Sequence, residues 1–164
     1  MSDQTERVVL ITGVAGGIGR ATAAVFHKHG WTVVGVDRHG GDVEHVDLGI
    51  EADISEEFSV GDVFRKIGER YGRLDALVNN AAMQVCKPII EMTTTEFDTV
   101  IASNLRSVFL STRYGFEMLK ESQGSVVNVS SVHAMATSKN IAAYAASKGG
   151  LLAFTRATAL EFGE

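Results

Sequence analysis

Hydrophobic residues alternate along the chain between short continuous runs and longer periodic stretches. The short runs are typical of strands buried on both faces of a sheet, and they cover residues 7–12, 31–37, 44–52, 74–79 and 125–130. The periodic stretches predict amphipathic helices over residues 18–29, 56–71 and 95–120, and from 141 almost to the end. Gly30 and Gly72 follow the first two stretches, where glycine commonly ends a helix, and Ser55 is expected to cap the second helix.

Strands that alternate with helices predict an α/β fold. Nearly continuous apolar strands favour a parallel sheet with helices on both faces, and right-handed crossovers make it a doubly wound sheet of the Rossmann type with about five strands. The chain contains no internal repeat, low-complexity tract or linker, so residues 1–164 are expected to form a single domain. Ligands bind such sheets at the carboxyl ends of the strands, and the polar motifs below all follow strand ends.

Composition and charge narrow the choice of partners and compartment. Hydrophobic residues make up 45% of the chain and there is one proline, as expected for a folded globular protein. The net charge of −5 argues against nucleic-acid or anionic-membrane partners, which require a cationic face. The single cysteine, Cys86, cannot form an internal disulfide, and the N-terminal apolar run is too short for a signal peptide or a membrane span. We therefore expect a cytoplasmic protein.

A glycine-rich segment, TGVAGGIG at residues 12–19, follows the first strand and opens the first helix. Glycines at such a point let the backbone turn tightly and approach a pyrophosphate at the helix N-terminus. Asp37, at the end of the second strand, can accept hydrogen bonds from ribose hydroxyls and would repel a 2′-phosphate, which favours NAD over NADP. Arg38 beside it could instead accommodate that phosphate. The alternatives are a glycine-rich turn without a ligand, and an aspartate that serves only a turn.

Tyr144 and Lys148 are four residues apart and therefore share one face of the last expected helix. A free phenol has a pKa of about 10, which makes it a poor proton acceptor at neutral pH. A neighbouring ammonium favours the phenolate and makes the phenol a usable acid or base. Ser131 precedes the pair, at the end of the fifth strand. A Tyr–Lys pair alone is common on helix surfaces, and its position beside Ser131 is what indicates chemistry.

Taken together, the T-G-x-x-x-G-x-G loop, the N-N-A-A segment at residues 79–82, Ser131 and the Y-x-x-x-K pair resemble the short-chain dehydrogenase/reductase family. The resemblance extends from about Val8 to the last residue. It implies an NAD(P)-dependent oxidoreductase that interconverts a secondary alcohol and a ketone by hydride transfer. The positions that it assigns to cofactor binding are Gly13, Gly17, Ile18, Gly19, Asp37, Asp53, Ile54, Asn80, Ala81, Tyr144 and Lys148.

The same resemblance implies a catalytic set of Asn104, Ser131, Tyr144 and Lys148. In this set Tyr144 is the acid/base, Ser131 bonds the substrate oxygen, Lys148 bonds the nicotinamide ribose, and Asn104 holds a water in the proton relay. Gln84 and His133 resemble positions that bind the substrate carboxylate in relatives that oxidise 3-hydroxybutyrate. The alternative for Asn104, Gln84 and His133 is that they are polar residues without a fixed role. No metal is expected.

The sequence departs from the family pattern at three points. Ala82 replaces a glycine of the N-N-A-G signature, and the segment between Asp37 and Asp53 is short, so its helix is expected to be reduced to a loop. Family members continue with further strands and a substrate lid, so the chain is expected to be C-terminally shortened and strand 125–130 to have an unpaired edge.

These departures leave other functions open. One alternative is a non-catalytic dinucleotide-binding or interaction module. A nucleotide-sugar epimerase is a weaker alternative, because its loop would be spaced T-G-x-x-G-x-x-G. The resemblance also implies a homodimer or homotetramer formed through helices 95–120 and 144–162, and a small-molecule alcohol or ketone substrate.

Overall fold

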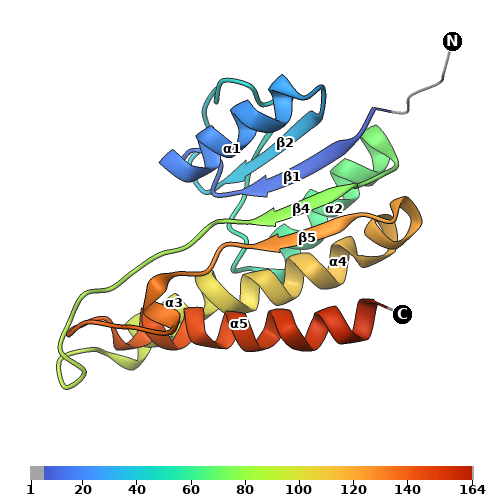
Figure 1. Ribbon diagram of the computed structural model, residues 1–164. Coiled ribbons are helices and arrows are strands. Elements are labelled where there is room, and N and C mark those ends of the chain that lie inside the picture. Colours follow the sequence, from blue (N-terminus) through green and yellow to red (C-terminus); the bar gives the residue numbers. More distant parts are fainter. Residues whose placement is uncertain (1–5, 164) are drawn as a thin grey trace, which may run out of the picture.

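A computed structural model describes residues 6–163 and contains one five-stranded sheet (Figure 1). All neighbouring strands pair in parallel, in the order β3-β2-β1-β4-β5. The strands are β1 (Val8–Thr12), β2 (Thr32–Asp37), β3 (Leu48–Glu51), β4 (Ala76–Asn79) and β5 (Ser125–Asn128). The strand order reverses between β1 and β4, so their carboxyl ends flank the crevice in which doubly wound sheets bind ligands.

Helices connect the strands, as the alternation predicts, except between β2 and β3. They are α1 (Gly17–Lys28), α2 (Glu57–Tyr71), α3 (Thr94–Ile101), α4 (Ser107–Ser122) and α5 (Ala142–Phe162). A π-helical turn, Ala102–Arg106, joins α3 to α4, and a 3₁₀ turn, Val132–Ala134, precedes α5. The predicted fold, an α/β doubly wound parallel sheet with about five strands, is therefore confirmed.

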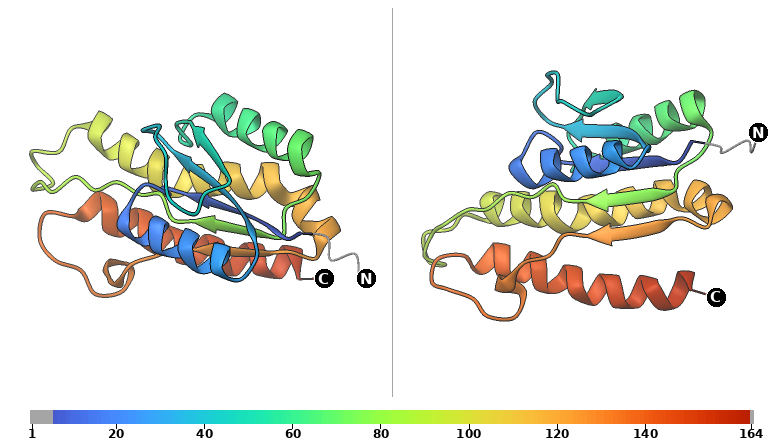
Figure 2. Two further views of the ribbon diagram at one scale, coloured as in Figure 1. Left: turned by 90° about the horizontal axis from the view of Figure 1, so that it is seen from above. Right: turned by 45° about the horizontal axis from the view of Figure 1, so that its top comes forward.

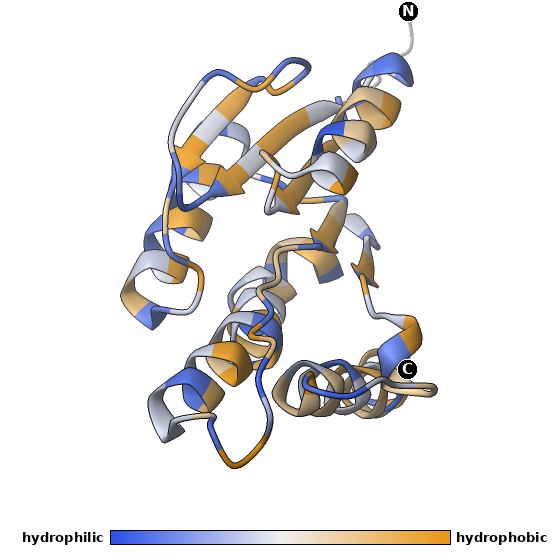
Figure 3. Cartoon of the chain, turned by 90° about the vertical axis from the view of Figure 1, so that its left-hand side faces the viewer, coloured by the Kyte–Doolittle hydropathy of each residue, from blue (hydrophilic) through white to orange (hydrophobic). Residues whose placement is uncertain are grey.

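The core is divided by the sheet into two clusters of buried side chains. One face packs against α2 and α4 and contains Leu10, Leu77 and Ile67. The other face packs against α1 and contains Ile11, Val33 and Ala23. Figure 2 shows α1 and α2 on opposite sides of the strands, and Figure 3 shows hydrophobic residues concentrated in the strands. Alternate residues of each strand supply opposite faces, which explains the continuous apolar runs in the sequence.

Three local predictions were wrong. Ser55 does not cap α2, because its N–H and hydroxyl both donate to Asp53 Oδ1, at 2.9 and 2.7 Å, and the helix begins after Glu56 without a side-chain cap. β3 is shorter than the predicted 44–52, because His45 has a φ of +67° and ends a turn before the strand. The predicted helix 95–120 is interrupted by the π-turn. The expected loop between β2 and β3 is confirmed, since residues 38–47 contain no helix.

β5 lies at the edge of the sheet and pairs only with β4 in the part of the chain described. Its Val127 points to the α1 side of the sheet and is 50% exposed, because α1 covers β1 and β2 but does not reach β5. The expectation of an unpaired edge at this strand is therefore confirmed for residues 6–163.

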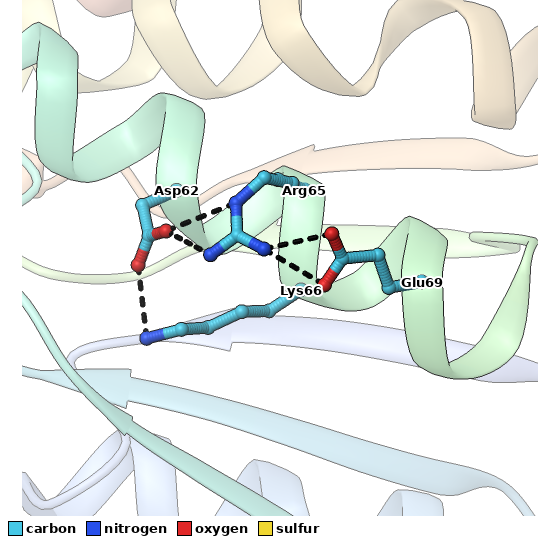
Figure 4. A network of polar contacts seen from close by, with 4 residues as sticks. All are labelled: Asp62, Arg65, Lys66 and Glu69. Atoms are coloured by element: carbon cyan, nitrogen blue, oxygen red, sulfur yellow. Dashed lines mark hydrogen bonds and ion pairs between the residues drawn. The ribbon is translucent and has the colours of Figure 1, made fainter.

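The solvent-facing side of α2 carries a network of ion pairs (Figure 4). Asp62 bonds Arg65 and Lys66, and Arg65 also bonds Glu69, all within one or two helical turns. Bonds from Lys66 and Arg65 lower the pKa of the Asp62 carboxyl. These pairs lie on an exposed face, where each adds a small amount to the stability of the helix. Within residues 6–163, no helix combines the length and apolar character needed to cross a membrane.

Candidate functional site

An open groove of about 320 Å³ lies at the carboxyl ends of β1 and β2, beside the segment that follows β4. Eight of the predicted cofactor positions line it: Gly13, Gly17, Ile18, Asp37, Asp53, Ile54, Asn80 and Ala81. The groove also contains residues to which the sequence assigned no cofactor role, namely Gly16, Val36, Ala52, Ala82 and Ser103, together with Arg38. Gly19 lies behind the loop rather than in the groove.

The glycines of the loop serve two different purposes. Gly13 has a φ of +67°, and a Cβ there would lie 2.7 Å from Ala81 Cα, so the fold itself requires this glycine. A Cβ at Gly19 would lie 2.2 Å from the Gly13 carbonyl oxygen, so that position is also fixed by packing. A Cβ at Gly17 would meet nothing within 4 Å, although Gly17 lines the groove. The fold therefore does not require a glycine at position 17. A ligand that approaches the backbone there would require one, because a side chain would block it.

The start of α1 is suited to an anion. Gly16 is its N-cap and no side chain in the described part of the chain caps it. The N–H groups and the positive end of the helix dipole therefore face the groove, where a pyrophosphate would be stabilised. These features fit a dinucleotide. The N–H groups of Gly17 and Ile18 would hold its phosphates, since those of Gly13 and Gly16 already donate to backbone carbonyls, and Asp37 would hold its adenosine ribose.

Asp37 and Asn80 hold the loop in place from either side. Asp37 Oδ2 accepts the Ala15 N–H at 3.0 Å and Oδ1 accepts the His39 N–H at 3.3 Å. Asn80 Nδ2 donates to the carbonyls of Thr12 and Gly13 at 3.0 and 3.1 Å. The Thr12 hydroxyl accepts the N–H groups of Asn80 and Ala81, both at 3.1 Å. Thr12 opens the T-G-x-x-x-G-x-G loop, but its bonds to the segment after β4 could not be predicted, because they join residues 68 and 69 positions apart.

Asn104 is completely buried in the middle of the π-turn. Its Oδ1 accepts the Met83 N–H and its Nδ2 donates to the Met83 carbonyl, both at 2.8 Å. Nδ2 also donates to Ser147 Oγ at 3.0 Å. All three bonds join the π-turn to other segments, so the Asn104 side chain fixes the segment after β4 against α5. π-Helical turns are frequent at functional sites.

Lys148 and Tyr144 extend from α5 toward the carboxyl end of β5. Lys148 is 2% exposed, its Nζ donates to the Val129 carbonyl at 2.7 Å, and Nζ lies 5.9 Å from the Tyr144 ring centre. Burial lowers the pKa of Lys148 to about 8. Among residues 6–163 this ammonium has one carbonyl partner, and with so little water contact it is costly to bury. Such buried lysines are typical of functional sites.

His133 connects Ser131 to Tyr144. Ser131 Oγ accepts the His133 N–H at 3.2 Å, and the His133 ring meets the Tyr144 ring edge-on, with centres 6.1 Å apart. His133 Nδ1 is buried and has no hydrogen-bond partner among residues 6–163. Gln84 is exposed, and its Nε2 donates to Cys86 Sγ at 3.1 Å. The structure thus brings Ser131, His133, Tyr144 and Lys148 together, and leaves Gln84 on the surface.

Exchanging single glycines for alanine should separate fold from ligand binding. Gly17→Ala is expected to leave the melting temperature within about 2 °C, because the methyl group enters open space and alanine favours the helix. It should weaken dinucleotide binding at least tenfold, because Gly17 lines the groove and a phosphate bound close to its backbone would meet the added methyl group. Gly19→Ala is expected to lower the melting temperature clearly, since its methyl group would meet backbone. Calorimetric titration and thermal melts would check both; unchanged binding by Gly17→Ala would contradict the placement of the phosphates.

Within residues 6–163 no group of three or more His, Cys, Asp or Glu side chains is arranged to hold a metal ion. The site therefore consists of a groove with an uncapped helix start, and a Tyr–Lys pair at the same edge of the sheet, of which the lysine is buried and the tyrosine half-buried.

Comparison with known proteins identifies the family. The chain is 37% identical to an uncharacterized oxidoreductase of Thermotoga maritima, over 94% of this chain and 64% of that protein. It is 36% identical to a 3β-hydroxysteroid dehydrogenase of Mediterraneibacter gnavus, over 96% and 61%. The structure of an aldohexose dehydrogenase of Thermoplasma acidophilum superposes with a TM-score of 0.91 at 32% identity, over 98% of this chain and 63% of that one.

The chain thus spans less than two thirds of the length of these relatives. The family model described as short chain dehydrogenase matches residues 7–164, which is nearly the whole sequence. This match, the relatives and the shared fold show that the chain belongs to the short-chain dehydrogenase family of oxidoreductases, whose members use a nicotinamide dinucleotide.

Proposed function

We propose that this protein binds NAD and interconverts a secondary alcohol and a ketone by hydride transfer. The observation that supports this most strongly is the buried Lys148 beside Tyr144, at the same edge of the sheet as the groove. A buried ammonium destabilises the fold, so a lysine at this position is best explained by a functional role. The bound dinucleotide would supply or accept the hydride, and the residues of the chain provide position, charge and a path for the proton.

Tyr144 is the proposed acid/base. During oxidation its phenolate accepts the proton of the substrate hydroxyl, and during reduction its phenol donates a proton to the carbonyl oxygen. The Lys148 ammonium stabilises the phenolate, which favours proton transfer near neutral pH. Ser131 donates a hydrogen bond to the substrate oxygen. Its hydroxyl hydrogen has no acceptor among residues 6–163, where the Ser131 oxygen accepts the His133 N–H. His133 and Gln84 are proposed to contact the substrate away from the reacting carbon.

The adenosine end is proposed to select NAD. The Asp37 carboxylate lines the groove while it holds the glycine loop, so a 2′-phosphate would meet a negative charge. Asp37→Asn should improve the affinity for NADP relative to NAD by about tenfold or more, because the repulsion disappears and Arg38 can approach the phosphate. Competitive binding of NAD and NADP would measure this ratio. A variant that keeps the original preference would show that Asp37 acts only on the loop.

Assembly and substrate are also proposed from the family. The exposed faces of α4 and α5 carry large apolar side chains such as Phe109 and Leu160, which would be covered in a homodimer or homotetramer. Two of the relatives named above are a hydroxysteroid dehydrogenase and an aldohexose dehydrogenase, so a small molecule with a secondary alcohol or a carbonyl is the proposed substrate. A cytoplasmic setting is consistent with the free Cys86.

The test is to incubate the protein with NAD and a panel of secondary alcohols that includes a 3β-hydroxysteroid, an aldohexose and cyclopentanol. Formation of the reduced cofactor is monitored by its absorbance. Reduction that depends on the alcohol supports the proposal. Tight NAD binding without turnover for any alcohol supports the second candidate, a non-catalytic dinucleotide-binding module. That candidate is favoured by the edge of β5, which pairs only with β4 within residues 6–163 and could therefore pair with a partner.

A further inference from the structure

Ser147 is a buried hydroxyl at the junction of three segments that surround the proposed chemistry. It lies in α5 between Tyr144 and Lys148 and has no exposed surface. Its hydroxyl donates to the Tyr144 carbonyl at 2.7 Å and accepts Asn104 Nδ2 at 3.0 Å. Ser147 therefore bonds both the helical turn that carries the acid/base and the π-turn.

Through Asn104, the same hydroxyl also reaches the segment after β4. The Asn104 amide makes two further bonds, both to Met83: its Nδ2 donates to the Met83 carbonyl and its Oδ1 accepts the Met83 N–H. A side-chain amide has two N–H donors, and in Asn104 one is committed to Met83 and the other to Ser147. Since Asn104 is completely buried, removal of the Ser147 acceptor would leave one N–H without a partner and away from water.

We propose that Ser147 is a positioning residue, which holds the Asn104 amide in the orientation that clamps Met83 against the Tyr144–Lys148 turn. Ser147 does not contact the reacting atoms. It fixes the distance between α5, which carries the acid/base, and the segment after β4, which borders the groove. The effect of this clamp on turnover rests on the proposed function, whereas its effect on Met83 does not.

The chain offers a matched control within the same helix. Thr155 Oγ1 donates to the Leu151 carbonyl at 2.7 Å and accepts Asn128 Nδ2 at 2.9 Å. It thus makes the same two kinds of hydrogen bond, to a helix carbonyl and from an asparagine amide, but it joins α5 to β5 two turns away from Ser147. Thr155→Val removes this hydroxyl with little change in volume.

The experiment measures amide hydrogen exchange of Met83 by NMR in the full chain, for wild type, Ser147→Ala, Thr155→Val, Asn104→Ala and the double variant Ser147→Ala/Asn104→Ala. Ser147→Ala should speed exchange of the Met83 amide at least tenfold, and Thr155→Val should change it less than twofold. Asn104→Ala should speed it at least as much as Ser147→Ala does. The double variant should match Asn104→Ala alone, because Ser147 acts through Asn104.

Turnover provides the second readout. Ser147→Ala should lower kcat by about tenfold to a hundredfold, with the KM for the dinucleotide within about twofold, because the reacting groups are misplaced while the groove is intact. An unchanged Met83 exchange rate in Ser147→Ala, or the same increase in Thr155→Val, would overturn the proposal. If wild type does not turn over at all, the proposed function fails, and the exchange rates still decide the role of Ser147.

Discussion

Tyr144→Phe is expected to reduce kcat by about 10³-fold while the affinity for the dinucleotide changes less than twofold. The substitution removes only the phenolic oxygen, which is the proposed proton donor and acceptor, and general acid–base catalysis contributes 10²- to 10⁴-fold to a rate. The ring remains, so its edge-on contact with His133 and the packing of α5 are preserved. Steady-state kinetics and calorimetric titration with NAD would measure the two effects separately.

Tyr114→Phe is the matched control for this substitution. Tyr114 lies in α4 and its hydroxyl donates to Glu57 at 3.2 Å on the surface, away from the groove. Loss of that hydroxyl should leave kcat unchanged. An equal decrease in both variants would mean that the tyrosine hydroxyls matter only for folding. A Tyr144→Phe variant with wild-type kcat would rule out Tyr144 as the acid/base.

Lys148→Met is expected to abolish most of the turnover and, at neutral pH, to stabilise the fold. Turnover should decrease by about 10²-fold or more, because the phenolate loses the charge that stabilises it. The gain in stability follows from burial, which lowers the pKa of Lys148 to about 8. At pH 7 the native state must bury an ammonium that the unfolded chain keeps in water. Methionine removes this penalty, and the free energy of unfolding should rise by about 1–2 kcal/mol after the lost bond to Val129 is counted.

The stability difference between wild type and Lys148→Met is expected to depend on pH. The folded pKa of Lys148 lies below the ordinary value of 10.5, so between about pH 8 and pH 10.5 the unfolded chain binds more protons than the native state. The free energy of unfolding of wild type therefore receives a contribution that rises with pH across this window. The advantage of Lys148→Met should shrink in the same window. Lys66→Met, which removes an exposed lysine paired with Asp62, should show no such gain. Urea unfolding at pH 7 and pH 10 would compare the three proteins.

The sheet could be predicted from the sequence because its signals are local. β1, β2 and β4 are buried on both faces, and the sequence of each is a nearly continuous apolar run between polar turns. The glycine loop could also be predicted, because the backbone leaves no room for a side chain at Gly13 and Gly19. The errors fall where a side chain competes with regular structure: Asp53 takes the hydroxyl that was expected to cap α2, and His45 adopts a left-handed conformation before β3.

The hydrogen bonds that hold the site together could not be predicted, because they join segments that are far apart in the sequence. Asn104 was singled out by its motif, but its bonds to Met83 and Ser147 span 21 and 43 residues. The π-turn that places it leaves no periodic signal, because five residues of π-helix hardly disturb a helical pattern. Ser147 lies next to Lys148 in the motif, and only the structure shows that its hydroxyl joins two catalytic segments.

The most direct test of the proposed function is the transfer of hydride itself. The chain is incubated with NAD and a secondary alcohol deuterated at the carbinol carbon, and the reduced dinucleotide is analysed by mass spectrometry. We expect one deuterium in each reduced dinucleotide, and no reduced dinucleotide with Tyr144→Phe on the same timescale. NAD that is bound by wild type but recovered only in its oxidised form, with every alcohol of the panel, would contradict the assignment of this chain as an active oxidoreductase.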